Sequence, residues 1–190
     1  MSTLKGLDRV PPAPAVSASL AAVTLFPVSE SQALDIFAYP NMIDQVHKPR
    51  VLFLCTGNSC RSQLAEGWLR HLAADRFESF SAGSKPAGFV HPLAIRAMAE
   101  VGVDIFGHRS KSLDEFAGQE FDLLITVCDD AREACPVFSG AKRQLHWGLD
   151  DPADAAGGDN EKMAVFRRIR DEIGVRIRQF LASSDMEMMG

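Results

Sequence analysis

The pattern of hydrophobic and polar positions changes at about residue 50. Before that point the chain is rich in Pro, Ala, Ser and Val, and six prolines from Pro11 to Pro49 interrupt any long element. Short helices are expected at 15–25 and 31–37. We predict that residues 1–49 form an extension without catalytic residues. The folded domain is expected to cover residues 50–183, followed by a tail of residues 184–190.

After residue 50, short apolar runs alternate with amphipathic stretches, which is typical of β-α-β units on a parallel sheet. Strands are predicted at 50–54, 77–81, 121–127 and 143–146, and helices at 62–74, 92–101, 113–117 and 161–182. The last helix places one apolar stripe at spacings of three or four residues: Met163, Phe166, Ile169, Ile173, Ile177 and Leu181. The expected fold is α/β, a three-layer sandwich around a central four-stranded parallel sheet.

Composition narrows the class of protein. The 190 residues are 46% hydrophobic, which is enough for one core, and no apolar run approaches the roughly 20 residues that cross a bilayer. The first residues also lack the pattern of a secretory leader, so we expect a cytoplasmic protein without a membrane partner. A net charge of −5 argues against nucleic-acid binding.

The cysteines and histidines indicate thiol chemistry rather than a metal centre. The four cysteines occur in a chain without export signals, so we expect free thiols in a reducing compartment. The five histidines show no ligand spacing with one another or with the cysteines. We therefore predict no zinc site.

The segment after the first strand carries the clearest chemistry. It reads Cys55-Thr56-Gly57-Asn58-Ser59-Cys60-Arg61-Ser62, and backbone N–H groups can converge on an anion at such a turn from strand to helix. Cys55 and Arg61 form a Cys-x5-Arg pattern, in which the thiolate faces the central atom of a tetrahedral oxyanion and the guanidinium binds two of its oxygens. The alternative is a buried cysteine and an unrelated surface arginine.

Residues 55–61 are therefore the expected oxyanion-binding loop, with Cys55 as its nucleophile. The loop N–H groups and the helix dipole predict that the pKa of Cys55 lies below its ordinary value of about 8.5. Ser62 can donate its hydroxyl to the sulfur, whereas Cys60 is interpreted as a packing residue.

A candidate acid follows the last strand. Displacement at a tetrahedral centre needs a proton for the departing oxygen, and Asp151, held by Pro152, is the predicted donor, with Asp150 as the second choice. The alternative is an Asx turn before Pro152.

These residues give the chain a resemblance from about residue 50 to residue 181. It resembles the low-molecular-weight protein tyrosine phosphatase family, and within it the thioredoxin-coupled arsenate reductases. The similar stretches are CTGNSCRSQLAEGW, the SAG at Ser81 to Gly83, VCDDAREACP, HWGLDDPA and FRRIRDEIG. The resemblance implies reduction of arsenate to arsenite by a monomer without a tightly bound cofactor.

The same resemblance implies a relay of three cysteines. Cys55 would attack arsenate, Cys128 would then attack Cys55 and release arsenite, and Cys135 would take over the disulfide, which thioredoxin would reduce. The alternative reading of Cys128 and Cys135 is two small core residues.

The spacing of the second pair predicts a structural change. Asp130 to Glu133 can form a capping box, and a helix would separate Cys128 from Cys135 by about 10 Å along its axis. A disulfide needs Cα atoms within roughly 7 Å, so oxidation should unwind residues 129–136.

The chain departs from the family at a cation site. Many such reductases bind potassium through residues matching Asn58, Glu66 and Ser81, completed by an aspartate at a position that corresponds here to Lys111. We expect the Lys111 ammonium to replace potassium electrostatically, so no metal site is predicted.

Two other functions remain open. A phosphatase acting on phosphotyrosine or small phosphate esters would use the same loop, although Ala153 and Asp154 stand where the phosphatases usually carry aromatic residues. A sensor that binds arsenite or switches its thiols without turnover is the non-enzymatic alternative.

Overall fold

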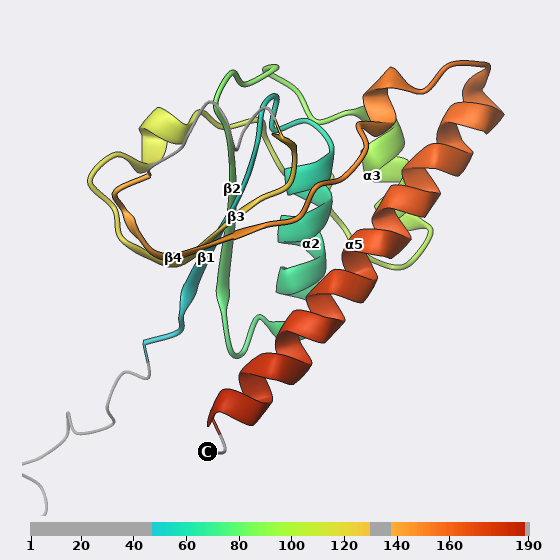
Figure 1. Cartoon of the computed structure of the whole chain (residues 1–190). Coiled ribbons are helices and arrows are strands. Elements are labelled where there is room, and N and C mark those ends of the chain that lie inside the picture. Colours follow the sequence, from blue (N-terminus) through green and yellow to red (C-terminus); the bar gives the residue numbers. More distant parts are fainter. Residues whose placement is uncertain (1–46, 130–137, 189–190) are drawn as a thin grey trace, which may run out of the picture. The chain divides into compact units, whose positions relative to one another are not determined.

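The fold confirms the predicted parallel sheet. The computed structural model describes residues 47–129 and 138–188, with side chains up to residue 183. Strands β1 (Arg50–Cys55), β2 (Glu78–Gly83), β3 (Phe121–Thr126) and β4 (Ala141–His146) form one parallel sheet in the order β2-β1-β3-β4 (Figure 1). Because the strands are parallel, all four carboxyl ends lie at one edge of the sheet.

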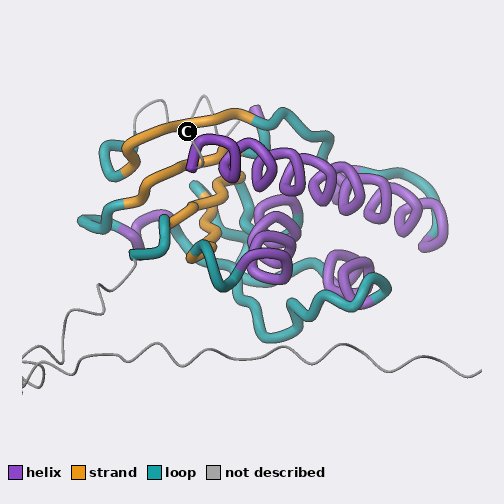
Figure 2. The backbone as a smooth tube through the Cα atoms, turned by 90° about the horizontal axis from the view of Figure 1, so that it is seen from below, coloured by secondary structure: helices purple, strands orange, loops and turns teal. Residues whose placement is uncertain are grey.

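Three helices cover one face of this sheet. Helices α2 (Arg61–Ala73), α3 (Pro92–Ala99) and α5 (Asp159–Met188) contact one another and lie together on one side of the strands (Figure 2). The predicted stripe of α5 is confirmed, since all six of its residues are buried: Met163, Phe166, Ile169, Ile173, Ile177 and Leu181. The apolar face of α5 therefore closes the core over α2 and α3.

A short 3-10 turn, η2 (Leu113–Phe116), packs on the other face. Side chains of β2 alternate, so Ser79 bonds to α2 while Phe80 stacks edge-on against Phe116, with ring centroids 6.0 Å apart. The α-helix expected at 113–117 is wrong in type. A capping box at Ser112 starts the turn, and Gly118, with a φ of 75°, follows too soon for an α-helix to form.

The last helix is longer than the sequence predicted. It begins at Asp159 and reaches Met188, into the residues expected to be a tail. Residues 183–188 contain no proline or glycine, so nothing in them ends the helix. The early start is also favourable, because two acidic residues in the first turn face the positive end of the helix dipole.

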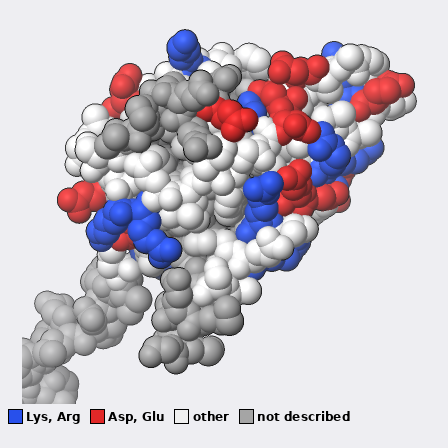
Figure 3. Space-filling view, viewed as in Figure 1, with Lys and Arg blue, Asp and Glu red and all other residues white. Residues whose placement is uncertain are grey.

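Several sequence predictions lie outside the described residues. These are the two short helices before residue 47, the capping box at 130–133, and Cys135. In the described part of the chain, no helix combines the length and the apolar character needed to cross a bilayer. On the face seen in Figure 3, acidic and basic side chains lie intermixed.

Candidate active site

Three loops meet at the carboxyl edge of the sheet. The oxyanion-binding loop follows β1, Cys128 follows β3, and Asp151 precedes the short turn η3 (Pro152–Asp154) after β4. Thr56 Oγ1 lies 3.5 Å from Cys128 Sγ, and the Arg61 guanidinium is paired with the Asp151 carboxylate. The edge therefore gathers five of the six predicted catalytic residues, and the sixth, Cys135, is outside the described residues.

The Cys55 sulfur is buried among hydrogen-bond donors. It lies 3.0 Å from Ser62 Oγ and accepts a hydrogen bond from the Asn58 N–H at 3.1 Å. Only 2% of Cys55 is exposed. The contact expected between Ser62 and the sulfur is therefore present.

The predicted direction of the Cys55 pKa is wrong. Burial raises the pKa of this thiol above its ordinary value, and the hydrogen bonds from Ser62 and Asn58 lower it by less. Cys128 nearby raises the pKa further. The physical reason is desolvation, since a thiolate loses more hydration in this core than the loop donors return.

The start of α2 is suited to an anion. Cys60 occupies the N-cap position but makes no side-chain bond to the first turn, and none of the first-turn residues of α2 is acidic. Free N–H groups at a helix start attract negative charge. Cys60 itself is buried with a pKa raised by burial to about 12, as expected of a packing residue.

Asn58 holds the loop in an unusual conformation. Its φ is 46°, so its N–H can turn towards the Cys55 sulfur. Its side chain donates to Ser62 Oγ at 2.8 Å and to Ser81 Oγ at 2.9 Å. The Gln63 amide donates to Asn58 Oδ1 at 2.9 Å and to the Asn58 carbonyl at 3.1 Å. Gln63 was not predicted as a site residue, because in the sequence it is only a polar residue in the first turn of a buried helix.

The end of β2 packs closely against the oxyanion-binding loop. A Cβ atom at Gly83 would lie 2.6 Å from the Thr56 carbonyl oxygen, so only glycine allows this approach. The chain that follows bonds along the loop backbone, where Ser84 N donates to the Cys55 carbonyl at 3.1 Å and Ala87 N donates to that of Gly57 at 2.8 Å.

Arg61 and Asp151 join two sides of the site. Arg61 Nη1 donates to the Leu149 carbonyl at 2.9 Å, while Nη2 bonds to Asp151 Oδ2. The other oxygen of Asp151 accepts from Ala153 N at 3.0 Å, so the Asx turn is also present. Asp150 points elsewhere and pairs with Arg168 on α5 at 2.9 Å. Geometry therefore favours Asp151 over Asp150 as the acid at this site.

Lys111 lies beside the oxyanion-binding loop, at the position compared above with a potassium ligand. Lys111 Nζ is 2.9 Å from Glu66 Oε2, an oxygen that also accepts from Ser81 Oγ at 2.5 Å. The Lys111 N–H donates to Asn58 Oδ1 at 2.7 Å. Burial would raise the pKa of Glu66, but the Lys111 ammonium and the Ser81 hydroxyl hold it below its ordinary value. The Lys111 ammonium compensates the buried carboxylate together with Arg70, which pairs with its other oxygen.

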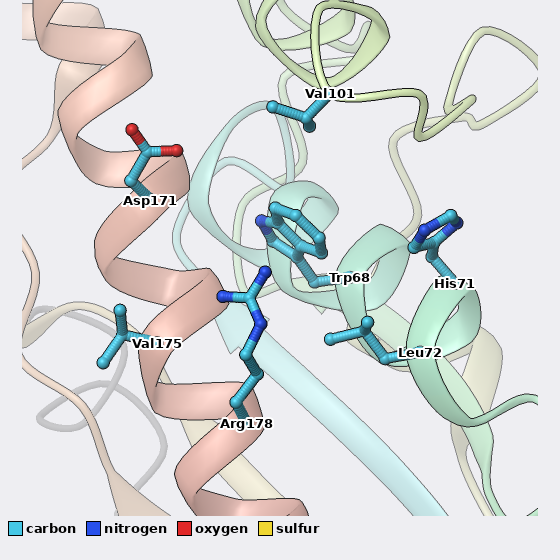
Figure 4. A pocket seen from close by; sticks show the side chains of 7 residues that line it. All are labelled: Trp68, His71, Leu72, Val101, Asp171, Val175 and Arg178. Atoms are coloured by element: carbon cyan, nitrogen blue, oxygen red, sulfur yellow. The ribbon is translucent and has the colours of Figure 1, made fainter.

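A separate cavity of about 480 Å³ lies between α2 and α5 (Figure 4). It is lined by Trp68, His71, Leu72, Val101, Asp171, Val175 and Arg178. None of these residues belongs to the oxyanion-binding loop or to the Asp151 turn. The cavity is therefore separate from the residues predicted to be catalytic.

Comparison with known proteins agrees with this geometry. Residues 50–188 match the family of low molecular weight phosphotyrosine protein phosphatases. An arsenate reductase of Halalkalibacterium halodurans is 49% identical over 135 residues, which are 71% of this chain and 96% of that protein.

Solved structures show the same fold. An arsenate reductase in a phosphate-binding state aligns with a TM-score of 0.58 and 33% identity, covering 71% of this chain and 98% of the other. A thioredoxin-dependent arsenate reductase of Corynebacterium glutamicum aligns with a TM-score of 0.58 and 34% identity, covering 74% of this chain and 63% of that one.

Proposed function

This chain belongs to the low molecular weight phosphotyrosine protein phosphatase family, and from that premise we propose that it is a cytoplasmic arsenate reductase that serves arsenic detoxification. The observation that carries the proposal is the placement of a second thiol beside the nucleophile. Cys128 is buried at the same sheet edge as Cys55, and its Sγ contacts Thr56, the residue next to the nucleophile. A hydrolase has no need of that second thiol, whereas a reductase needs one to supply electrons.

The first step uses the residues around Cys55. The thiolate sulfur attacks arsenic and the bond from arsenic to a hydroxyl of arsenate breaks. That hydroxyl takes one proton from Asp151, which acts in its protonated form, and leaves as water. The Arg61 guanidinium and the N–H groups at the start of α2 stabilise the charge of the oxyanion. Because burial raises the pKa of Cys55, the thiolate depends on its hydrogen bonds from Ser62 and Asn58.

The second step oxidises thiols and reduces arsenic. The Cys128 thiolate attacks the Cys55 sulfur, the S–As bond breaks, and its electron pair stays on arsenic, which leaves as arsenite. Cys135 then attacks Cys128 and frees Cys55 as a thiolate. A dithiol such as that of thioredoxin reduces the Cys128–Cys135 bond, so the cycle needs no tightly bound cofactor. In this proposal the chain works as a monomer.

The test is arsenite release by the purified chain with thioredoxin, thioredoxin reductase and NADPH. We expect sustained NADPH oxidation by the wild type and none by Cys128→Ser or Cys135→Ser. Turnover that persists in either variant would contradict the relay. Capture of one equivalent of arsenite without turnover would instead indicate a sensor.

Hydrolysis of phosphate esters is the second candidate function. Cys55, Arg61 and Asp151 are sufficient for it, and Phe89 is 55% exposed on the segment that bonds to the oxyanion-binding loop. An aryl ring could stack there. Hydrolysis of an aryl phosphate that depends on Cys55 but is unchanged in Cys128→Ser, together with an absence of arsenite release, would establish a phosphatase.

A further inference from the structure

One histidine binds residues on both sides of Cys128. His146 Nδ1 lies 2.8 Å from Thr126 Oγ1, and His146 Nε2 lies 2.9 Å from Asp129 Oδ1. Thr126 ends β3 and Asp129 directly follows Cys128. A single imidazole therefore spans the cysteine from strand to loop.

The position of this imidazole is set by the sheet. His146 is the last residue of β4 and pairs in register with Thr126, and the next N–H, of Trp147, donates to the Thr126 carbonyl at 2.8 Å. The side chain of His146 is 25% exposed. A Cβ atom at Gly148 would lie 3.3 Å from His146 Nε2, so the glycine leaves room for the contact with Asp129.

The two partners of His146 indicate which ring nitrogen carries the proton. A carboxylate only accepts, so the proton of a neutral imidazole lies on Nε2, towards Asp129. Nδ1 is then the acceptor 2.8 Å from the Thr126 hydroxyl, which also lies at a longer 3.4 Å from the Leu145 carbonyl. Both ring nitrogens are satisfied by the two residues that flank Cys128.

Resting on the proposed function, we propose that His146 is a positioning residue for Cys128. It holds residues 126–129 so that the Cys128 thiol stays beside Cys55 for the attack that releases arsenite. Val127 N, which donates to the Leu54 carbonyl at 2.9 Å, anchors the chain before the cysteine. On the other side, the Asp129 side chain is 80% exposed, and its contact with His146 is an anchor among the described residues.

This role is local rather than a source of global stability. Exposed pairs of this kind contribute little to the free energy of unfolding. Small displacements of a reacting group can nevertheless lower a rate by up to about 100-fold. Loss of the exposed contact with Asp129 should therefore slow one chemical step with little change in the melting temperature.

The experiment isolates that step in a Cys135→Ser background. Without thioredoxin, each chain can release one arsenite and stop as a Cys55–Cys128 disulfide, which quenched alkylation and mass measurement detect. We expect His146→Ala to slow arsenite release about tenfold, with a smaller loss in Asp129→Ala. His146→Gln should recover part of the rate, because its amide can donate to Asp129 and accept from Thr126.

Two controls separate positioning from damage to the fold. Lys142→Ala removes another exposed ion pair of β4, with Asp122 at 2.7 Å, and should leave the rate unchanged. The alkylation rate of Cys55 by iodoacetamide should also stay at the parent value in every variant, because the oxyanion-binding loop is untouched.

The possible outcomes are distinguishable. Arsenite release at the parent rate in His146→Ala, or a parallel fall in Cys55 alkylation, would overturn the positioning role. If His146→Ala does not fold, a parent rate in Asp129→Ala, whose changed side chain lies at the surface, would overturn it as well. No arsenite release by the parent itself would refute the proposed function and this role with it.

Discussion

The two sides of Cys55 are held in different ways. On the side of α2 and β2, Asn58, Ser62, Ser81 and Glu66 are all buried and joined by hydrogen bonds. On the side of β3 and β4, contacts among the described residues reach partly exposed groups, such as the Asp151 carboxylate that pairs with Arg61. The first side fixes the nucleophile. In the proposed reaction, the second consists of groups that exchange partners when an oxyanion enters and a disulfide forms.

Removing the Arg61 guanidinium, which extends from α2 to Leu149 and Asp151 on the other side, should have the largest effect. We expect Arg61→Ala to lower kcat/KM for arsenate by about 10²–10³-fold, because a main donor to the oxyanion is lost. Arg61→Lys should recover only part of the rate, since an ammonium cannot bind two oxygens in a planar fork. Steady-state arsenite production measures both, and a lysine variant with the wild-type kcat/KM would contradict the two-oxygen contact.

Breaking the buried network on the side of α2 and β2 should mainly lower the free energy of unfolding. Lys111→Met removes one of the two cationic partners of the buried Glu66 carboxylate and leaves Arg70 as the other. We expect the free energy of unfolding at neutral pH to fall by about 2 kcal/mol. Because the pKa of Glu66 is held low in the fold, the stabilisation is present above its unfolded pKa and is lost as the pH falls through the folded pKa. Denaturant titrations should therefore converge for the two proteins in acid.

The matched control for this change is Lys142→Met, which breaks an exposed pair with Asp122 and should cost less than about 1 kcal/mol. The same buried ammonium predicts that wild-type activity does not depend on potassium. Activity that rises strongly with potassium but not with sodium would show that Lys111 does not replace the cation.

A smaller effect should follow from removing one donor to the sulfur. In Ser62→Ala, a hydrogen bond that lowers the pKa of Cys55 is lost, so the pKa should rise further. Alkylation of Cys55 by iodoacetamide increases with pH through this pKa, and at neutral pH it should slow about tenfold. Ser79→Ala is the control, because its buried hydroxyl bonds to the Glu66 carbonyl at 3.1 Å and not to the sulfur. An unchanged pH profile would remove Ser62 from the activation of Cys55.

Local patterns were enough to predict much of the fold and of the site. The apolar runs located β1 and β3, and the stripe from Met163 to Leu181 located α5. Strand β4 was predicted at 143–146 and covers Ala141–His146, a mostly exposed segment without an apolar run. The expected contact of Ser62 with Cys55 is present because both residues belong to one strand-loop-helix unit. The sequence predicted an α-helix at 113–117, whereas η2 is a short 3-10 turn. Gly118, with its positive φ, follows too soon for an α-helix to form.

Chain order and residue type alone place a nucleophile, an arginine and a second thiol after parallel strands, because alternating β-α units must bring those strand ends to one edge. They could not decide the pKa of Cys55, which depends on how many atoms from distant segments exclude water from its sulfur. Nor could they pair Lys111 with Glu66 or His146 with Asp129, since these contacts join residues far apart in the chain. Such contacts depend on the register and packing of the whole sheet, which no single segment encodes.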